Sequence, residues 1–163
     1  YIGNRESPMY LSLVTDAYSK KIMGFDVSNS LDTCGAINAL KRAIKRRSYD
    51  NTLIHHYDRG LQYCSDAYQK VLSSNHIKCS MTQSYDPYQN AIAERVNGIL
   101  KQEFIQGIRT TDLQLMTKLI KESIDIYNQQ RPHWSCHLNT PNKMHQQKTL
   151  TIKTYKKQNS TSC

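Results

Sequence analysis

Short apolar runs separated by polar turns predict five β-strands along the chain. In each run the apolar residues stand together or alternate with polar ones, as in strands buried on one or both faces. The polar segment Asp16–Lys21 lies between two of the runs and predicts a hairpin turn. The predicted strands are Tyr1–Ile2, taken as the tail of a strand, then Met9–Val14, Ile22–Val27, Thr52–Tyr57 and Ile77–Met81.

Apolar residues spaced three and four positions apart predict four helices in the remaining segments. Asp32 or Thr33 is expected to cap the first helix and Ser65 the second, and Thr111–Gln114 has the pattern of a capping box before the fourth. The first helix is expected to run from its cap to about Arg47 and the second from Asp66 to about Ser74. The third is expected to run from about Asn90 to Gln106, and the fourth from its capping box to about Gln130. The faces expected to be buried carry Ile37, Leu40 and Ile44 in the first helix, Tyr68, Val71 and Leu72 in the second, and Val96, Ile99, Leu100 and Phe104 in the third.

The order of these elements predicts the fold class. Hairpin-connected strands come first, and later strands are separated by helices, which indicates an α/β domain with a mixed five-stranded sheet and helices on both faces. We expect residues 1–147 to form this domain, with the first strand largely cut off. The polar residues 148–163 are expected to form a mostly disordered tail.

Charge and cysteine content narrow the possible functions. The 163 residues carry a formal net charge of +9, which suggests a polyanionic partner such as nucleic acid, although a solvated basic surface explains the charge as well. Five scattered cysteines without a CxxC pair argue against a disulfide framework and favour a reducing compartment. No apolar run reaches transmembrane length, so no membrane partner is expected.

Two carboxylates are the first candidates for chemistry. Asp58 follows a buried strand, Glu94 lies in the first turns of a predicted helix, and 35 residues separate them. Across a cleft, such a pair could hold Mg²⁺. Taken singly, Asp58 could equally be a turn residue and Glu94 a solvent-facing helix residue. Asn97, Gly98 and Lys101 share the helix face of Glu94, a strip that suits a phosphate backbone or is simply exposed.

Several sequence blocks resemble those of bacterial insertion-sequence transposases, relatives of the retroviral integrases with a DDE catalytic core. Their order and spacing match that family over about residues 1–146, including the 35-residue gap between the two acids. The blocks are His55–Tyr63, Pro87–Glu94 with Leu100–Glu103 behind it, Tyr127–His133, Thr140–His145 and the strand-turn-strand segment Leu11–Phe25.

The resemblance implies a ribonuclease H-like fold and a polynucleotidyl transferase in which three carboxylates hold two Mg²⁺ or Mn²⁺ ions. Asp58 and Glu94 match the second and third acids. The resemblance also implies DNA as the partner, both transposon ends and target, a homo-oligomer on that DNA, and a bacterial cytoplasmic, nucleoid-associated location. The implied DNA-binding residues are Asn90, Asn97, Lys101 and Tyr85, and the supporting residues beside Asp58 are His56 and Arg59.

One departure from the family pattern bears on activity. The family's first aspartate lies three residues before the tyrosine that matches Tyr1, so it would fall upstream of this chain. Asp16 matches a turn position and is interpreted as a turn residue. We therefore expect this chain to be inactive by itself, because Mg²⁺ affinity depends on the number and charge of its ligands. The alternatives are an inactive remnant that binds DNA or a transposase, and a related nuclease that cuts without joining.

Overall fold

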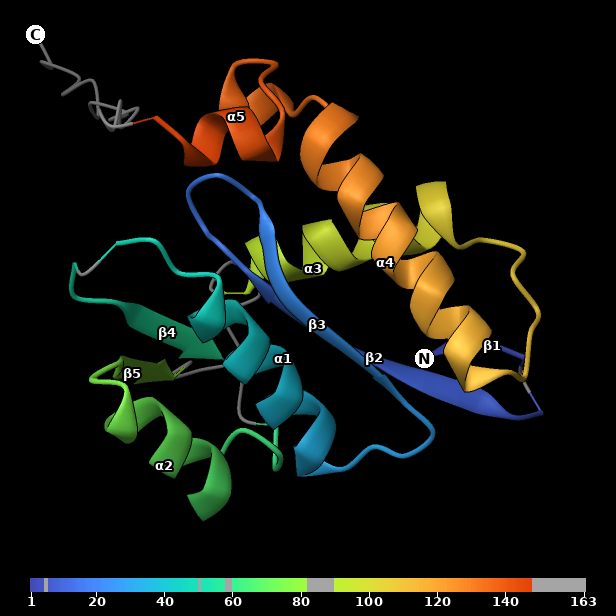
Figure 1. Ribbon diagram of the computed structural model, residues 1–163, viewed down its shortest axis with the longest axis horizontal. Helices are drawn as coiled ribbons and strands as arrows, with labels where there is room; N and C mark the ends of the chain where they lie inside the picture. The colour runs from blue at the N-terminus through green and yellow to red at the C-terminus, as the bar shows by residue number, and fades with distance from the viewer. Residues whose placement is uncertain (5, 50, 58–59, 82–89, 148–163) are drawn as a thin grey trace, which may run out of the picture.

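The five strands predicted from the sequence are present in the computed structural model, which describes residues 1–4, 6–49, 51–57, 60–81 and 90–147. They form an antiparallel ladder in the order β1-β2-β3 and a parallel ladder of β4 and β5 (Figure 1). Their bounds are Ile2–Gly3 for β1, Pro8–Thr15 for β2, Ile22–Ser28 for β3, Ile54–Tyr57 for β4 and Lys78–Met81 for β5.

The expected single five-stranded sheet is divided between these two ladders. β1 pairs with one end of β2 through Ile2 opposite Met9 and Gly3 opposite Pro8. The rest of β2 pairs with β3, and among the described residues no ladder joins β2 to β4. β1 has two residues and pairs only with Met9 and Pro8 of β2.

Helices cover both faces of the strands, as predicted. Ser65 caps α2 by accepting a hydrogen bond from the Tyr68 backbone, as expected. Asp112 caps α4 by accepting from the backbone nitrogens of Gln114 and Leu115, so this helix starts one residue later than the Thr111 box predicts. The helices are α1 Thr33–Lys45, α2 Asp66–Ser74, α3 Ala91–Ile99, the π-helix η1 Leu100–Phe104, α4 Leu113–Gln130, the 3₁₀-helix η2 Trp134–Cys136 and α5 Pro141–His145.

Alternate residues of β3 face the two helical layers. Phe25 and Val27 belong to the core beneath α3, η1 and α4, whereas Asp26 faces α1 and forms an ion pair with Arg42 at 2.9 Å. A second apolar cluster joins α1 and α2 to β4 and the segment before β5 through Ala36, Leu40, Tyr57, Tyr68, Leu72 and Ile77. The first cluster thus holds α3 against the antiparallel ladder, and the second holds β4 beside α1 and α2.

The face of α1 that is buried differs from the prediction. Ala36, Ala39, Leu40 and Ala43 are buried, while Ile37 and Ile44 are only partly buried. Small side chains lie inward because α1 approaches β3 closely at Gly24, where an added Cβ would overlap the carbonyl oxygen of Ala39. Backbone proximity, rather than side-chain size, therefore selects this face.

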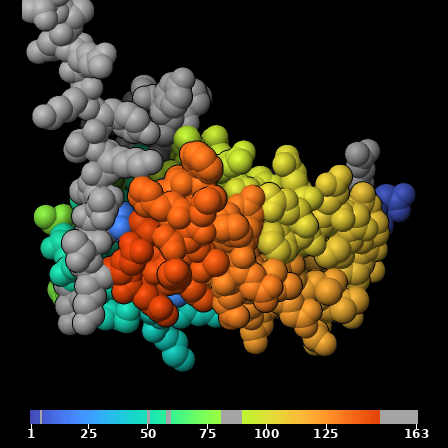
Figure 2. All heavy atoms as spheres, turned by 90° about the horizontal axis from the view of Figure 1, so that it is seen from above, coloured from blue at the N-terminus to red at the C-terminus, as the bar shows by residue number. Residues whose placement is uncertain are grey.

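The predicted helix over 90–106 changes geometry partway along. α3 ends at Ile99 and continues as the π-helix η1, which is closed by a 3.2 Å hydrogen bond from the Ile105 nitrogen to the Leu100 carbonyl. This wider turn brings Ile105, 7% exposed, to the same buried face as Leu100. In Figure 2 the yellow segment that contains η1 lies against the orange atoms of α4 on one face of the molecule.

The predicted polar tail, residues 148–163, lies outside the described residues, so the boundary at residue 147 stays a prediction. Within the part of the chain that the structure describes, no helix is both long and apolar enough to cross a membrane.

Candidate active site

A cavity of about 170 Å³ joins the end of β4 to the start of α3. β4 contributes His55, His56 and Tyr57, and the helix side contributes Asn90, Ala93 and Asn97. Two sequence blocks that lie far apart in the chain therefore meet at one cavity. Asp58, Arg59 and Tyr85, which were predicted to belong to this site, lie outside the described residues.

The polar face of α3, which was predicted to contact a phosphate backbone, is directed away from the core. Val96 and Ile99 are buried, which leaves Glu94 exposed and Asn97 partly exposed on the opposite side. Glu94 lies in the first turn of α3, between the cavity-lining residues Ala93 and Asn97. Lys101 is also exposed, so each of the three polar residues predicted for this face reaches solvent at least in part.

The two histidines of β4 have different surroundings because strand residues alternate between faces. His55 points inward, and its Nε2 lies 2.8 Å from the hydroxyl of Tyr68. Burial, followed by the neighbouring His56, lowers the pKa of His55 to about 4, so its ring is neutral at pH 7. His56 is exposed, and its Nδ1 lies 3.2 Å from the hydroxyl of Ser80. His55 therefore fastens β4 to α2, a role that sequence reasoning missed.

A larger cavity of about 460 Å³ occupies the gap between the two ladders. Its walls come from β2 and the hairpin turn, from β4, and from α1 and α3. The Tyr18 hydroxyl and the Arg47 Nε atom are buried and have no hydrogen-bond partner among the described residues, and both residues line this cavity. Unsatisfied buried polar atoms are costly, which suggests that further polar groups belong in this gap.

The donor atoms around the smaller cavity suit a hard cation only in part. Among the described residues no group of three or more His, Cys, Asp and Glu side chains lies close enough to hold a metal ion. Glu94 offers carboxylate oxygens, and Asn90 and Asn97 offer amide oxygens beside the cavity. These are oxygen donors of the kind that Mg²⁺ takes, and further carboxylates are required to complete a site.

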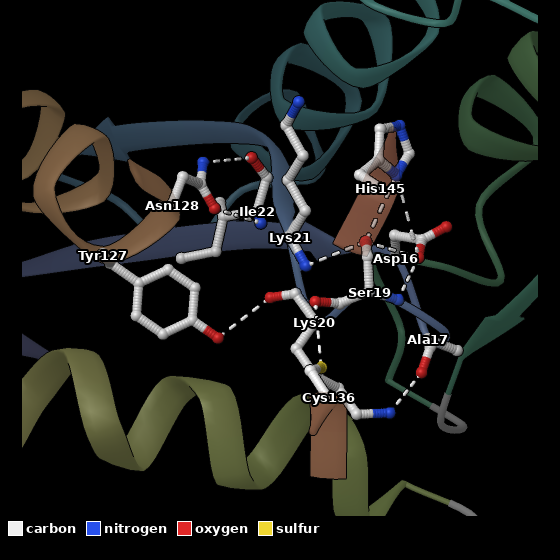
Figure 3. A network of polar contacts seen from close by, with 10 residues as sticks. All are labelled: Asp16, Ala17, Ser19, Lys20, Lys21, Ile22, Tyr127, Asn128, Cys136 and His145. Carbon is white, nitrogen blue, oxygen red and sulfur yellow. Dashed lines mark hydrogen bonds and ion pairs between the residues drawn. The ribbon is translucent and has the colours of Figure 1, made fainter. Parts of the chain in front are cut away.

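The C-terminal motifs form a polar network at the β2-β3 hairpin (Figure 3). Asp16 accepts hydrogen bonds from the backbone nitrogen and the hydroxyl of Ser19 at 2.6 and 2.7 Å, which confirms it as a turn residue. The Ser19 hydroxyl lies 3.2 Å from Nδ1 of His145 in α5, and the thiol of Cys136 lies 3.5 Å from the Ser19 carbonyl oxygen. These contacts fasten α5 and η2 to the hairpin.

The paired Tyr127 and Asn128 of α4 hold the other side of the hairpin (Figure 3). The Tyr127 hydroxyl donates to the Lys20 carbonyl oxygen at 2.9 Å. Asn128 accepts from the Ile22 nitrogen and donates to the Ile22 carbonyl, both at 3.0 Å. The Tyr-Asn pair of the C-terminal block is therefore structural, although sequence alone shows only that the two residues are adjacent in a helix.

Asn128→Ala is expected to lower the free energy of unfolding by about 2–4 kcal/mol, because both backbone groups of buried Ile22 lose their partner. Urea unfolding followed by circular dichroism measures the loss. Gln129→Ala, at the exposed neighbouring position of α4, is the control and should change stability little. Equal stability of the two variants would show that the Ile22 bonds contribute nothing.

Comparison with known families matches the chain to integrase core domain models. One model matches residues 1–87, and a second model with the same description matches residues 75–141. The matched segments together include β4, α3 and the cavity residues between them.

Among curated proteins, a transposase of insertion sequence element IS986/IS6110 from Mycobacterium tuberculosis is 31% identical over 145 residues. That match covers 83% of this chain and 51% of the relative. Transposase InsF of insertion sequence IS3A from Escherichia coli is 33% identical over 137 residues, with 83% and 48% covered. The chain thus spans about half the length of these curated relatives.

Solved structures of retroviral integrases share the fold. The HTLV-2 integrase catalytic core domain in complex with magnesium, in its trimeric form, matches with a TM-score of 0.67 at 20% identity, and 88% of each chain is covered. A chain of the simian T-cell lymphotropic virus intasome bound to a PP2A regulatory subunit gives a TM-score of 0.75 at 19% identity, covering 99% of this chain and 57% of that one. The predicted ribonuclease H-like α/β class is confirmed.

Proposed function

Because the chain belongs to the integrase core domain family, we propose that it is the core of an insertion-sequence transposase. In this proposal the core binds transposon ends and target DNA, and within the intact parent protein it supports metal-dependent strand cleavage and transfer. Regulation by an inactive remnant is the alternative, and strand-transfer activity distinguishes the two.

The observation that carries the proposal is the cavity between β4 and α3. It brings the residues just before Asp58 beside the first turn of α3, which contains Glu94. Tyr57, the residue before Asp58 in the sequence, thus lines the cavity that also borders the first turn of α3, and this convergence supports a shared site for Asp58 and Glu94.

Asp58 and Glu94 would hold the divalent ions, with Mg²⁺ or Mn²⁺ as the expected metals and two ions in a complete site. When bound, such ions activate the attacking oxygen and stabilise the leaving oxygen of a phosphodiester. The chain's own residues orient the DNA: the amides of Asn90 and Asn97 flank Glu94. Support for magnesium comes from the HTLV-2 integrase core, whose structure contains it.

We further propose that an extended segment of the parent protein fills the gap between β2 and β4 and supplies a third carboxylate. The β1–β2 register supports this, since a residue three positions before Tyr1 would lie opposite Leu13 in the same register. Leu13 lines both cavities, next to the β4 and α3 residues. Tyr18 and Arg47, whose buried hydroxyl and Nε atom have no partner among the described residues, line the larger cavity that such a strand would enter.

The exposed face of α3 is the proposed DNA contact. None of the described residues has an atom within 4 Å of the position that a Cβ on Gly98 would occupy, so a phosphate backbone could approach the helix there. Lys101 follows on the same face and would pair with a phosphate as a point charge. We also propose a homo-oligomer on DNA, which is supported by the dimeric and trimeric forms of the HTLV-2 integrase core.

DNA binding by this chain should weaken steeply with salt, with a slope of log K against log salt of about −3 or steeper. The reason is the release of counterions when a chain of net charge +9 contacts several phosphates. Fluorescence anisotropy with a labelled duplex, repeated over a range of salt concentrations, measures the slope. Lys101→Ala should make the slope shallower by about 0.9, the value of one phosphate contact.

Lys118→Ala removes the same charge from the exposed side of α4 and is the matched control. The proposed interface predicts a slope for this variant equal to that of the unaltered chain. Binding that does not respond to salt would contradict a phosphate-dominated interface. Equal losses in the Lys101 and Lys118 variants would contradict the assignment to α3.

A further inference from the structure

The ion pair between Glu103 and Arg131 connects the end of the candidate DNA-binding helix to the end of α4. Arg131 donates from its Nε to one carboxylate oxygen of Glu103 and from a terminal nitrogen to the other, each at 2.6 Å. This forked geometry is more directional than a pair of point charges. The two hydrogen bonds between these side chains lower the pKa of Glu103 and raise the pKa of Arg131. Both groups are therefore charged at neutral pH.

Arg131 also contacts the two residues that follow it in the chain. It donates to the carbonyl oxygen of Pro132 at 3.1 Å, and a terminal nitrogen lies 3.5 Å from Nε2 of His133. Burial, followed by the Arg131 charge, lowers the pKa of His133 to about 4, so its neutral ring accepts from Arg131 instead of repelling it. The His133 ring packs edge-on against Tyr127, which is anchored to the hairpin at Lys20.

Glu103 lies within η1, two residues after Lys101. Relative to an α-helix, the π-turn changes the direction in which residues after Ile99 project. Phe104, beside Glu103, packs edge-on against Tyr127 of α4, and the ion pair joins Glu103 to Arg131, which directly follows α4. Figure 2 shows the two segments side by side. Glu103 and Arg131 bond to each other, and neither is among the residues that line the cavity.

We propose that the Glu103–Arg131 pair is a positioning pair, which holds the π-turn in the one arrangement that directs Lys101 toward a DNA phosphate beside Glu94. This inference rests on the proposed function, because it requires Lys101 to contact DNA. It assigns a role to Glu103 of the Leu100–Glu103 block and to Arg131 of the Tyr127–His133 block, which the metal site leaves unexplained. The ion pair acts on DNA only through Lys101.

Glu103→Gln distinguishes a positioning effect on Lys101 from an effect of net charge on DNA binding. Removing a negative charge should strengthen DNA binding if only net charge matters. Positioning predicts the opposite: weaker binding and a salt slope shallower by about 0.9, equal to that of Lys101→Ala. The Lys101→Ala/Glu103→Gln double variant should show no further loss, because both changes remove the same contact. Fluorescence anisotropy with a labelled duplex at several salt concentrations gives all the slopes.

Glu122→Gln makes the same charge change on the exposed side of α4 and should leave the slope unchanged. Arg131→Lys keeps the charge but loses the fork, so it should shift the slope in the same direction as Glu103→Gln. Thermal unfolding of each variant verifies that it is folded. If Glu103→Gln behaves as Glu122→Gln does while Lys101→Ala still loses a contact, the positioning role is wrong and the DNA interface stands. If the unaltered chain shows no salt-dependent binding, both proposals fall.

Discussion

Glu94→Gln in the intact parent protein is expected to reduce strand transfer by about 10³-fold, which corresponds to about 4 kcal/mol of transition-state stabilisation. Glutamine keeps the size of the side chain but removes the charge that a hard divalent ion requires. Glu94 is exposed on α3, so the fold should be unaffected. Strand-transfer assays with labelled transposon ends, in Mg²⁺ and in Mn²⁺, measure the loss. Asp58→Asn should have the same effect.

Glu122→Gln is the matched control, since it removes one carboxylate from an exposed helix face outside the cavity. It should retain full activity. DNA binding by the Glu94 variant, measured without divalent metal, should equal that of the unaltered protein. Strand transfer by Glu94→Gln at the level of the control would show that this carboxylate holds no catalytic ion. Cleavage without joining in the unaltered parent would favour the nuclease alternative.

Gly24→Ala is expected to lower the free energy of unfolding by about 3 kcal/mol or more, because the added methyl group meets backbone rather than flexible side chain. The new Cβ would overlap the Ala39 carbonyl oxygen and lie 2.7 Å from the Ala43 nitrogen. Relief requires moving α1 off β3 as a whole, which would disturb the Asp26–Arg42 ion pair as well. Urea or guanidinium unfolding, followed by circular dichroism, measures the change.

Gly98→Ala serves as the opposing control. The same substitution there meets no atom of the described part of the chain within 4 Å and lies inside α3, where alanine is the better helix former. Stability should rise by about 0.5–1 kcal/mol. A Gly24→Ala variant as stable as the unaltered chain would show that α1 and β3 are not in close contact at this position.

Local patterns in the sequence were sufficient for most of the elements. The predicted strands and helices are present, Ser65 caps its helix, and Asp16 is a turn residue. The buried stripe of α3 follows the predicted residues through Leu100. These features depend on interactions between residues a few positions apart, which sequence periodicity and capping patterns record.

Three features depended on distant parts of the chain and were not predictable from local pattern. α1 turns its alanines inward because of Gly24 on β3. The π-turn of η1 arises where Leu100 and Ile105 both reach the core. Asn128 and His145 fasten the hairpin of β2 and β3 from helices more than a hundred residues away. No periodicity or motif in the chain signals such contacts.

The sequence by itself determined the chemistry that is available: which residues are acids, amides and cations, and at what spacing they occur on strand and helix. The tertiary structure decided which of them meet. Packing brings the end of β4 and the first turn of α3 to one cavity, and it joins Glu103 to Arg131 across 28 positions of the chain. The physical reason is that side-chain type is a local property, whereas proximity depends on how the two apolar clusters pack the elements together.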